Sequence, residues 1–485
     1  MKKWMYRLPV ALALLEILTA LLYLGRAGQF GFPLDDAWIH QAYARNFGLH
    51  GIMAFSPNQP SAGSTSLGWT LILALGYKLK IPFFIWTYTL GCLLTITTAF
   101  TAARLSERYF GNRDRAFIVA VICMLEWHLA WAGLSGMETS LFVFLTLLFF
   151  LLFERGISPL LLGALTGIIV TVRPEGILLA LVYGLSLLRI APPRDLKSLL
   201  RHAGAFLLAF ALMIGPWILF NLAYSGKPFP NTISAKFMQY GYPWSLFKSL
   251  KYLWDVLIYF VNGPLILLVP CAGWTVYNLI RTKSTRHLHP LIWSFTLIGL
   301  YAAALPAIYD HGRYLMPLIP FVVIYGVEGF HQFLERFVRA SLSRLAIWSA
   351  LFGILIALWI NAASDYAFRV QLYGTVHLQA AQWINRNAPP DAILATHDIG
   401  LIGYHTGRQV VDLAGLVTPE IVPLMNDQRK MAEYVRAQNV RYVIVYSGYF
   451  RVLLAELGAR LVFSPDAEKL RALHIEPFEV YEVGR

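Results

Sequence analysis

Long apolar runs, separated by short polar stretches, fill most of the chain. A helix needs about 20 apolar residues to cross a bilayer. Runs that approach this length predict spanning helices at 8–25, 82–103, 116–132, 139–153, 158–172, 175–190, 203–222, 255–280, 290–308, 314–330 and 345–362. The stretch 67–77 is shorter and amphipathic, so we expect a helix on the membrane surface there. The pattern predicts a polytopic α-helical membrane protein with about 11 transmembrane helices.

The pattern changes after the last predicted span, where charges become frequent and apolar runs become short. Three runs are typical of strands and one of a helix: 392–395, 410–413, 441–446 and 431–438, respectively. Strands that alternate with helices predict a small α/β domain. We therefore expect a transmembrane domain at 1–363 and an extracytoplasmic α/β domain at 364–485.

Composition agrees with a membrane protein, because 57% of the residues are hydrophobic and only 14% are charged. Soluble domains carry about 25% charged residues. The net charge of +13 would suggest nucleic acid in a soluble protein. Here the basic residues lie in short loops and form no stripe interleaved with aromatics, so we expect no nucleic-acid partner. Cys92, Cys123 and Cys271 lie within apolar runs, and their spacing fits neither a disulfide framework nor a zinc site.

The distribution of lysine and arginine predicts the orientation of the chain in the plasma membrane. The N-terminus is basic, and so is every second connection between the predicted spans: 104–115, 154–157, 189–202, 281–289 and 331–344. Basic loops stay on the cytoplasmic side. We therefore expect a cytoplasmic N-terminus, an uncleaved first span and an extracytoplasmic C-terminal domain. A span at 67–77 would reverse the orientation of all these loops, which favours a surface helix there.

Two adjacent carboxylates, Asp35 and Asp36, lie shortly after the first predicted span, in the outer loop 27–81. An aspartate is a good N-cap for the surface helix predicted to follow, but capping explains only one of the two. A close carboxylate pair raises the pKa of one member, which suits a general base. Such a pair can also bind a divalent cation, Mg or Mn. The pattern does not decide which aspartate is the base. His40 lies one helical turn after Asp36 and could face it.

Other ionisable residues lie at the outer ends of the predicted spans, where charge is costly and often functional. Glu138 is one of them. Arg173 and Arg313 suit a phosphate, because a guanidinium offers two parallel donors. Arg173 could instead pair with Glu175, and Arg313 with Asp310. Lys236, in the long outer loop 223–254, is a further phosphate candidate or a solvated lysine.

Hydroxyl-rich and turn-rich positions supply candidate sugar contacts. The segment 55–66 contains Ser64 and Thr65 and could bind a sugar or serve only as a connector. In the C-terminal domain, His397 and Asp398 look catalytic. Alternatively they form a strand-end turn, with Asp398 capping the next helix.

Several short motifs, taken in order, resemble those of a known group. They are Asp35-Asp36-Ala37-Trp38-Ile39, Tyr43-Ala44-Arg45-Asn46, Phe55-Ser56-Pro57, Ser61-Ala62-Gly63-Ser64-Thr65-Ser66, Gly136-Met137-Glu138-Thr139, Arg173-Pro174-Glu175-Gly176, Pro230-Asn231-Thr232, Lys236-Phe237, Arg313-Tyr314-Leu315-Met316-Pro317, His397-Asp398-Ile399-Gly400 and Val411-Asp412-Leu413-Ala414-Gly415-Leu416. This order resembles the mycobacterial arabinofuranosyltransferase type of GT-C glycosyltransferase. It is more distantly similar to the dolichyl-phosphate-mannose mannosyltransferases and the aminoarabinose transferases.

The resemblance implies a GT-C fold and a plasma-membrane enzyme that takes a sugar from a polyprenyl-phosphate donor. The acceptor would be a hydroxyl of a glycan, glycolipid or protein on the outer face. The resemblance implies catalysis by the acidic pair. We further expect the donor phosphate on Arg313, Arg173 or Lys236, and substrate contacts from His40, Ser64, Thr65, Glu138, Asn231, Tyr314, His397 and Asp398. Leu67-Gly68 follows Ser66 where many relatives have proline, so the resemblance does not define the sugar.

A transporter or flippase of a lipid-linked or small anionic substrate is the alternative. It would predict inverted repeats and broken helices with buried charges near the membrane midplane. The sequence shows no repeat and places its charges at outer span ends, which favours the glycosyltransferase.

Overall fold

The computed structural model describes residues 2–57, 60–190, 196–241, 243–261, 263, 265–466, 470 and 475–484. Part of the basic segment 189–202 (191–195) and part of the turn-rich segment 55–66 (58–59) therefore lie outside the described residues. The chain forms two compact units. The helical unit comprises Met1–Arg26, Tyr88–Pro216 and Pro243–Asp365, and the mixed unit comprises Ala27–Thr87, Trp217–Tyr242 and Tyr366–Arg485. The outer loop thus groups with the C-terminal residues, whereas the sequence suggested a boundary at 363/364.

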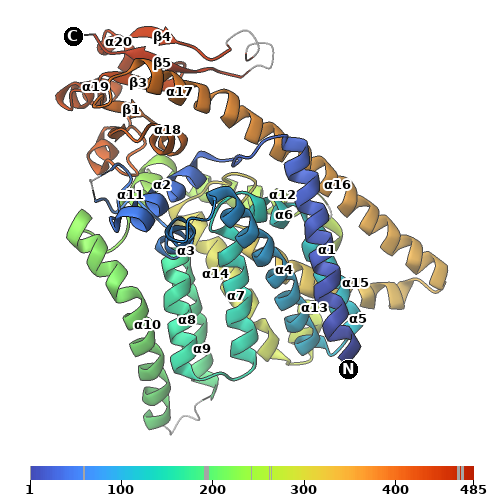
Figure 1. Ribbon diagram of the computed structural model, residues 1–485. Helices are drawn as coiled ribbons and strands as arrows, with labels where there is room; N and C mark the ends of the chain where they lie inside the picture. The colour runs from blue at the N-terminus through green and yellow to red at the C-terminus, as the bar shows by residue number, and fades with distance from the viewer. Residues whose placement is uncertain are drawn as a thin grey trace. The chain divides into compact units, whose positions relative to one another are not determined.

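The helical unit is built from long apolar helices (Figure 1). They are α1 (Lys2–Ala27), α4 (Phe83–Phe110), α5 (Arg113–Leu125), α6 (Trp127–Leu134), α7 (Thr139–Glu154), α8 (Pro159–Val172), α9 (Leu178–Ile190), α10 (Leu196–Ser225), α12 (Leu246–Val261), α13 (Leu265–Arg281), α14 (His289–Ala304), α15 (Ile319–Phe337) and α16 (Ser341–Thr375). The ends of α4, α10 and α16 extend into the mixed unit.

Five helical segments in the described part of the chain are long and apolar enough to cross a membrane. They are Arg7–Ala27, Phe83–Phe110, Leu196–Ser225, Met316–Phe337 and Ser341–Asn387, and two bent helix pairs raise the number to as many as seven. Four apolar helices are shorter: Thr139–Glu154, Pro159–Val172, Pro174–Leu187 and His289–Ala304. Each of the eleven predicted apolar runs lies on one of these helices or pairs. The number of crossings stays a prediction.

The prediction of one continuous span at 255–280 is wrong. Two helices, α12 and α13, occupy this region and meet at 105°. Gly263, between them, has a φ of +109°, outside the range that a helix allows. The predicted span at 116–132 is also broken, because α5 and α6 meet at 57°. Glu126 lies at that break, is fully buried, and accepts hydrogen bonds from the first amides of α6, those of His128 and Leu129.

The break leaves α12 with three distinct faces. One face is buried in the helical unit: Ser249, Tyr252, Val256 and Phe260. A second face is exposed and apolar: Leu246, Phe247, Leu250, Leu253, Trp254 and Leu257. The third carries the charges of Lys248, Lys251 and Asp255. This division is typical of helices that lie in a membrane interface.

The mixed unit combines short helices with a five-stranded sheet (Figure 1). Its helices are α2 (Asp35–His50), α3 (Leu67–Lys78), α11 (Asn231–Lys236), α17 (His377–Asn387), α18 (Ile399–Thr406), α19 (Gln428–Ala437) and α20 (Arg451–Glu456). Its strands are β1 (Leu394–Thr396), β2 (Val410–Asp412), β3 (Tyr442–Tyr446), β4 (Arg460–Phe463) and β5 (Phe478–Glu482). The sequence located α2, α3, α19 and the first three strands, and it offered α18 as the helix after Asp398. It did not locate α11, α17, α20 or the last two strands.

The strand order is β2-β1-β3-β5-β4. The pairs β1–β2 and β1–β3 are parallel, and the pairs β3–β5 and β4–β5 are antiparallel. From β1 the chain passes through α18 to β2 on one side. From β2 it passes through α19 to β3 on the other side. The three parallel strands therefore form a small doubly wound α/β sheet.

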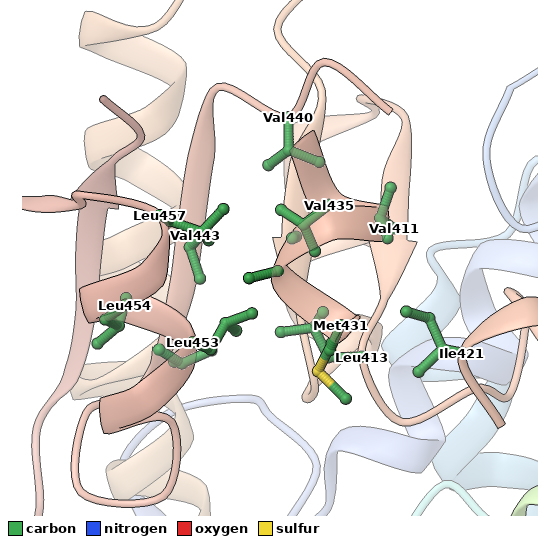
Figure 2. Packing of buried hydrophobic residues seen from close by; sticks show 13 residues of the cluster. Val411, Leu413, Ile421, Met431, Val435, Val440, Val443, Leu453, Leu454 and Leu457 are labelled. Carbon is green, nitrogen blue, oxygen red and sulfur yellow. The ribbon is translucent and has the colours of Figure 1, made fainter. Parts of the chain in front are cut away.

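Alternate residues of the sheet form a hydrophobic core with α19 and α20, as Figure 2 shows. The sheet contributes Ala395, Val411, Val443 and Val445, and the helices contribute Met431, Val435, Leu453, Leu454 and Leu457. The strand residues between these point to the other face of the sheet. There the ring of Trp383 in α17 lies 5.9 Å from the ring of Tyr442. Helices on both faces explain why the central strands β1 and β3 are buried along nearly their whole length.

Candidate active site

The two aspartates of the acidic pair begin α2 and have different surroundings. Asp35 is only 7% exposed. Its Oδ2 accepts a hydrogen bond from the amide of Gly400 at 2.6 Å, and its Oδ1 accepts one from the amide of Leu401 at 2.8 Å. These are the first free amides of α18, so Asp35 caps a helix that is remote in sequence. The N-cap position of its own helix is occupied by Leu34, which corrects the alternative that an aspartate caps α2.

Gly400 allows α18 to approach α2. A Cβ at this position would lie 2.1 Å from the carbonyl oxygen of Asp35, well inside contact distance. Burial raises the pKa of Asp35 well above its ordinary value, and the charges of Asp398 and Asp36 act in the same direction. Because both oxygens of Asp35 accept backbone amides, this carboxyl group holds the start of α18 against the start of α2.

Asp36 faces a lysine instead. The Nζ of Lys236 lies 3.8 Å from Oδ2 of Asp36, and their side chains are 21% and 23% exposed. The lysine is positioned by the start of α11. There the amide of Asn231 donates to the carbonyl of Ala62 at 3.2 Å, and the hydroxyl of Thr232 donates to the carbonyl of Gly63 at 2.7 Å. The structure thus brings together Asp36 and Lys236, which lie far apart in sequence.

The segment between α2 and α3 is fixed by its own hydroxyl groups. The hydroxyl of Tyr43 pairs with that of Ser61 at 2.7 Å and accepts the amide of Gly63 at 3.1 Å. Ser64 is buried and pairs with Thr70 at 3.0 Å, whereas Thr65 is half-buried. Ser64 therefore serves the connection between loop and helix in this structure.

A second polar cluster lies at the carboxyl end of β1. Oδ2 of Asp398 lies 3.1 Å from Nε2 of His377, and its Oδ1 lies 3.9 Å from Nε2 of His397. Asp398 occupies the N-cap position of α18 but makes no capping hydrogen bond, so the prediction that it caps this helix is wrong. Burial alone would raise the pKa of Asp398. The adjacent His397 and the hydrogen bond from His377 instead lower this pKa below its ordinary value.

The helical unit gathers the two predicted phosphate-binding arginines around one aromatic ring. The guanidinium carbons of Arg173 and Arg313 lie 4.8 Å and 5.4 Å from the ring centroid of Tyr314. Both arginines are buried. Arg173 also pairs with Glu175 at 2.7 Å and with Glu138 at 3.2 Å. The alternative of an ion pair between Arg173 and Glu175 is therefore present in the structure.

A divalent cation at the acidic pair stays a prediction. Each oxygen of Asp35 accepts one amide and keeps a further lone pair, and Oδ2 of Asp36 faces an ammonium group. Across the described residues, no group of three or more His, Cys, Asp or Glu has the geometry to hold a metal ion.

Sequence reasoning missed His377, which begins α17 and contacts Asp398. An isolated histidine in a polar segment carries no signal until the fold places it beside its partner. His40 is buried within α2.

The comparisons with known proteins come from a family model and from solved structures. Residues 364–481 match a domain of unknown function (DUF8728). No curated protein matches the chain in sequence. The apo crystal structure of the oligosaccharyltransferase from Archaeoglobus fulgidus is similar, with a TM-score of 0.65 and 12% identity over 94% of this chain and 71% of that chain.

A second group of similar structures is ArnT from Cupriavidus metallidurans. Its apo structure has a TM-score of 0.63 and 11% identity over 97% of both chains. Its structure bound to undecaprenyl phosphate has a TM-score of 0.57 and 12% identity, covering 100% of this chain and 98% of that chain. At such identities the likeness concerns the fold, and the chain has the GT-C glycosyltransferase fold.

Proposed function

We propose that this protein is a glycosyltransferase that transfers a sugar from a polyprenyl-phosphate donor to an acceptor hydroxyl on the outer face of the plasma membrane. The observation that carries the proposal is that the two aspartates of the acidic pair have different contacts. Asp35 is held by α18, and Asp36 is left partly exposed beside a cation. Two proteins of similar fold were solved with the lipid part of such donors: ArnT with undecaprenyl phosphate, and AglB from Archaeoglobus fulgidus with a dolichol-phosphate.

In the proposed reaction Asp36 is the general base. Its carboxylate accepts the proton of the acceptor hydroxyl, and the acceptor oxygen forms a bond to the anomeric carbon. The bond between that carbon and the phosphate oxygen breaks, and the lipid phosphate leaves with the electron pair. Positive charge near Asp36 would stabilise the leaving phosphate, and Lys236 supplies it. No nucleotide takes part in this reaction.

Arg313 or Arg173 is the alternative ligand that we propose for the donor phosphate. A phosphate on Arg173 would compete with the two carboxylates that pair with it. Tyr314 holds both guanidinium groups against its ring, which would limit their movement when an anion binds. Of the other predicted substrate contacts, Thr65 and His397 are partly exposed, whereas His40, Ser64, Glu138 and Asn231 are buried. The acceptor class (glycan, glycolipid or protein) and the sugar, with arabinofuranose as one candidate, belong to the proposal.

A transporter or flippase of lipid-linked substrates is the second candidate. Two observations favour it: the bent helix pairs, and the fully buried Glu126 at one of the bends. Broken helices with buried charge are the pattern expected of such transporters.

Transfer in proteoliposomes tests both candidates. The purified chain is reconstituted with undecaprenyl-phosphate-linked radiolabelled pentose or hexose and a lipid-linked acceptor extract. A labelled glycoside that disappears in Asp36→Asn and persists in Asp391→Asn, a matched exposed aspartate of the mixed unit, supports the glycosyltransferase. Movement of the donor between leaflets without a glycoside supports the flippase. A chain that produces neither contradicts both candidates.

A further inference from the structure

The small sheet of the mixed unit has a topological switch point between β1 and β3. The chain leaves β1 toward β2 on one side and returns to β3 on the other. In open α/β sheets, ligands bind outside the carboxyl ends of the strands at such a point, because the two connections diverge and leave a crevice. The edge where β1 and β3 end is therefore the part of this sheet best suited to a ligand.

Polar side chains with access to solvent lie at this edge. His397 and Asp398 directly follow β1, and Tyr446 is the last residue of β3. The rings of His397 and Tyr446 are 5.4 Å apart. The side chain of Asp398 is 28% exposed and that of His397 is 20% exposed. The switch point thus presents a carboxylate next to aromatic rings.

The fold does not use this carboxylate for its own backbone. Asp398 stands where an aspartate would normally cap α18, yet the first amides of that helix donate to Asp35. This frees Asp398 from capping and leaves it directed to His377. A carboxylate released from its usual local contact and kept at a strand end has the position expected of a ligand-binding group.

His377 is held rigidly behind Asp398. Its side chain is 1% exposed. Its ring contacts those of Tyr373, at 4.6 Å and 35°, and Phe478, at 4.3 Å and 27°. Its Nδ1 has no hydrogen-bond partner among the described residues, so Asp398 is the polar contact that the ring makes there. Because an ionised carboxylate can only accept, Nε2 carries the proton in this contact.

We propose that the switch point of this sheet is a sugar-binding subsite in which Asp398 accepts hydrogen bonds from ligand hydroxyls and His377 is its positioning residue. A carboxylate with one oxygen fixed by His377 can accept hydroxyl donors on its remaining lone pairs. The adjacent rings of His397 and Tyr446 offer apolar faces to the C–H groups of a sugar. The subsite rests on the proposed function and deepens it, because Asp398 precedes the helix whose first turn donates to Asp35, the neighbour of Asp36.

The test uses variants that separate packing from hydrogen bonding. His377→Phe keeps an aromatic ring against Tyr373 and Phe478 but removes the donor. His377→Gln keeps a donor without the ring, and Asp398→Asn removes the charge. In the proteoliposome assay, Asp398→Asn and His377→Phe are each expected to raise KM for the sugar substrate about tenfold or more, with kcat nearly unchanged. Each variant removes a hydrogen bond that involves the charged carboxylate. His377→Gln should recover part of the loss.

The double variant of His377→Phe and Asp398→Asn decides whether the histidine acts through the aspartate. Its KM should equal that of Asp398→Asn alone, since a positioning residue has nothing left to position. Additive effects would contradict this role for His377. An unchanged KM in Asp398→Asn would contradict the subsite itself.

Binding measured without turnover separates the subsite from the proposed reaction. Saturation-transfer NMR with methyl arabinoside, mannoside and glucoside, on the full chain in nanodiscs, should show a signal that Asp398→Asn removes and Asp391→Asn keeps. Such a signal without any transfer would leave the subsite standing and overturn the glycosyltransferase. Sugar transfer that does not depend on Asp398, together with NMR binding that does not depend on it, would support the glycosyltransferase and contradict the subsite.

Discussion

The carboxylate of Asp35 accepts the backbone amide of Gly400 at 2.6 Å, across 365 positions of sequence. This contact joins the start of α2 to the start of α18. The acidic pair therefore belongs to the same unit as the C-terminal sheet. The two aspartates have different surroundings within it. Asp35 accepts two backbone amides of α18, whereas Asp36 faces Lys236 and is the residue that we propose as the base.

The first prediction follows from this difference. Asp36→Asn should fold normally and lose about 10²- to 10⁴-fold in transfer rate, the usual contribution of a general base. Asp35→Asn should unfold more readily, by about 1–3 kcal/mol, because an amide cannot accept both backbone donors. Thermal unfolding in detergent, measured beside the transfer assay, checks both. Equal unfolding temperatures for the two variants would show that Asp35 has no structural task.

Gly400 offers a second prediction on the same contact. Gly400→Ala should destabilise the chain by about 1–3 kcal/mol, since its Cβ would lie 2.1 Å from the carbonyl oxygen of Asp35. Gly204→Ala is the matched control, because nothing lies within 4 Å of a Cβ at that helical position. A comparison of the unfolding temperatures of these two variants tests this prediction. A loss as large in the control would mean that the close approach at Gly400 is not the cause.

Local patterns were sufficient for most of the fold. Apolar run length located the helices, and alternating short runs located β1, β2 and β3. The break between α12 and α13 was missed, because the composition on both sides of Gly263 stays apolar and run length alone cannot show a bend. The strands β4 and β5 were missed because their residues are mostly half-exposed and polar or mixed in character.

The candidate site was predictable only in part. Adjacent carboxylates are visible in the sequence, so Asp35 and Asp36 were identified together. Their different tasks depend on Gly400 and Lys236, which come from distant segments that only the fold brings near. The contact of His377 with Asp398 depends likewise on the packing of α17 against the sheet, for which the sequence holds no local signal.

The arginine cluster of the helical unit gives a third prediction. Arg173→Gln should destabilise the chain by about 3–5 kcal/mol, because it leaves the buried carboxylates of Glu138 and Glu175 without their cation. Arg313→Gln should mainly raise KM for the polyprenyl-phosphate donor. Unfolding curves and donor titrations on both variants make the comparison. If Arg173→Gln folds as stably as the parent and also raises KM, Arg173 is a phosphate ligand rather than a structural residue.

A fourth prediction concerns the turn after β2. Asp412 is fully buried and accepts the amides of Ala414 at 2.8 Å, Leu416 at 2.5 Å and Val417 at 2.9 Å. Asp412→Asn should lower the free energy of unfolding by about 1–3 kcal/mol. The NH₂ group of the asparagine would replace one accepting oxygen and would oppose a backbone N–H donor. Asp391→Asn, at an exposed position of the same unit, is the control. Urea unfolding monitored by tryptophan fluorescence provides the measurement, and equal midpoints for the two variants would contradict a structural role for Asp412.

The three faces of α12 lead to the last prediction, that this helix lies in the membrane interface rather than across the bilayer. Spin labels at single cysteines along 247–258, in a background without the three native cysteines, report depth in nanodiscs. For an interfacial helix, depth should oscillate with the helical period and reach about 5–10 Å, deepest at the exposed apolar positions such as Leu250 and Trp254. Labels at Lys251 and Asp255 should stay in water. A spanning helix would instead show depth that increases steadily along the chain, by about 1.5 Å per residue, toward the bilayer centre. That result would return α12 to the membrane-spanning helices and require a different account of its bend against α13.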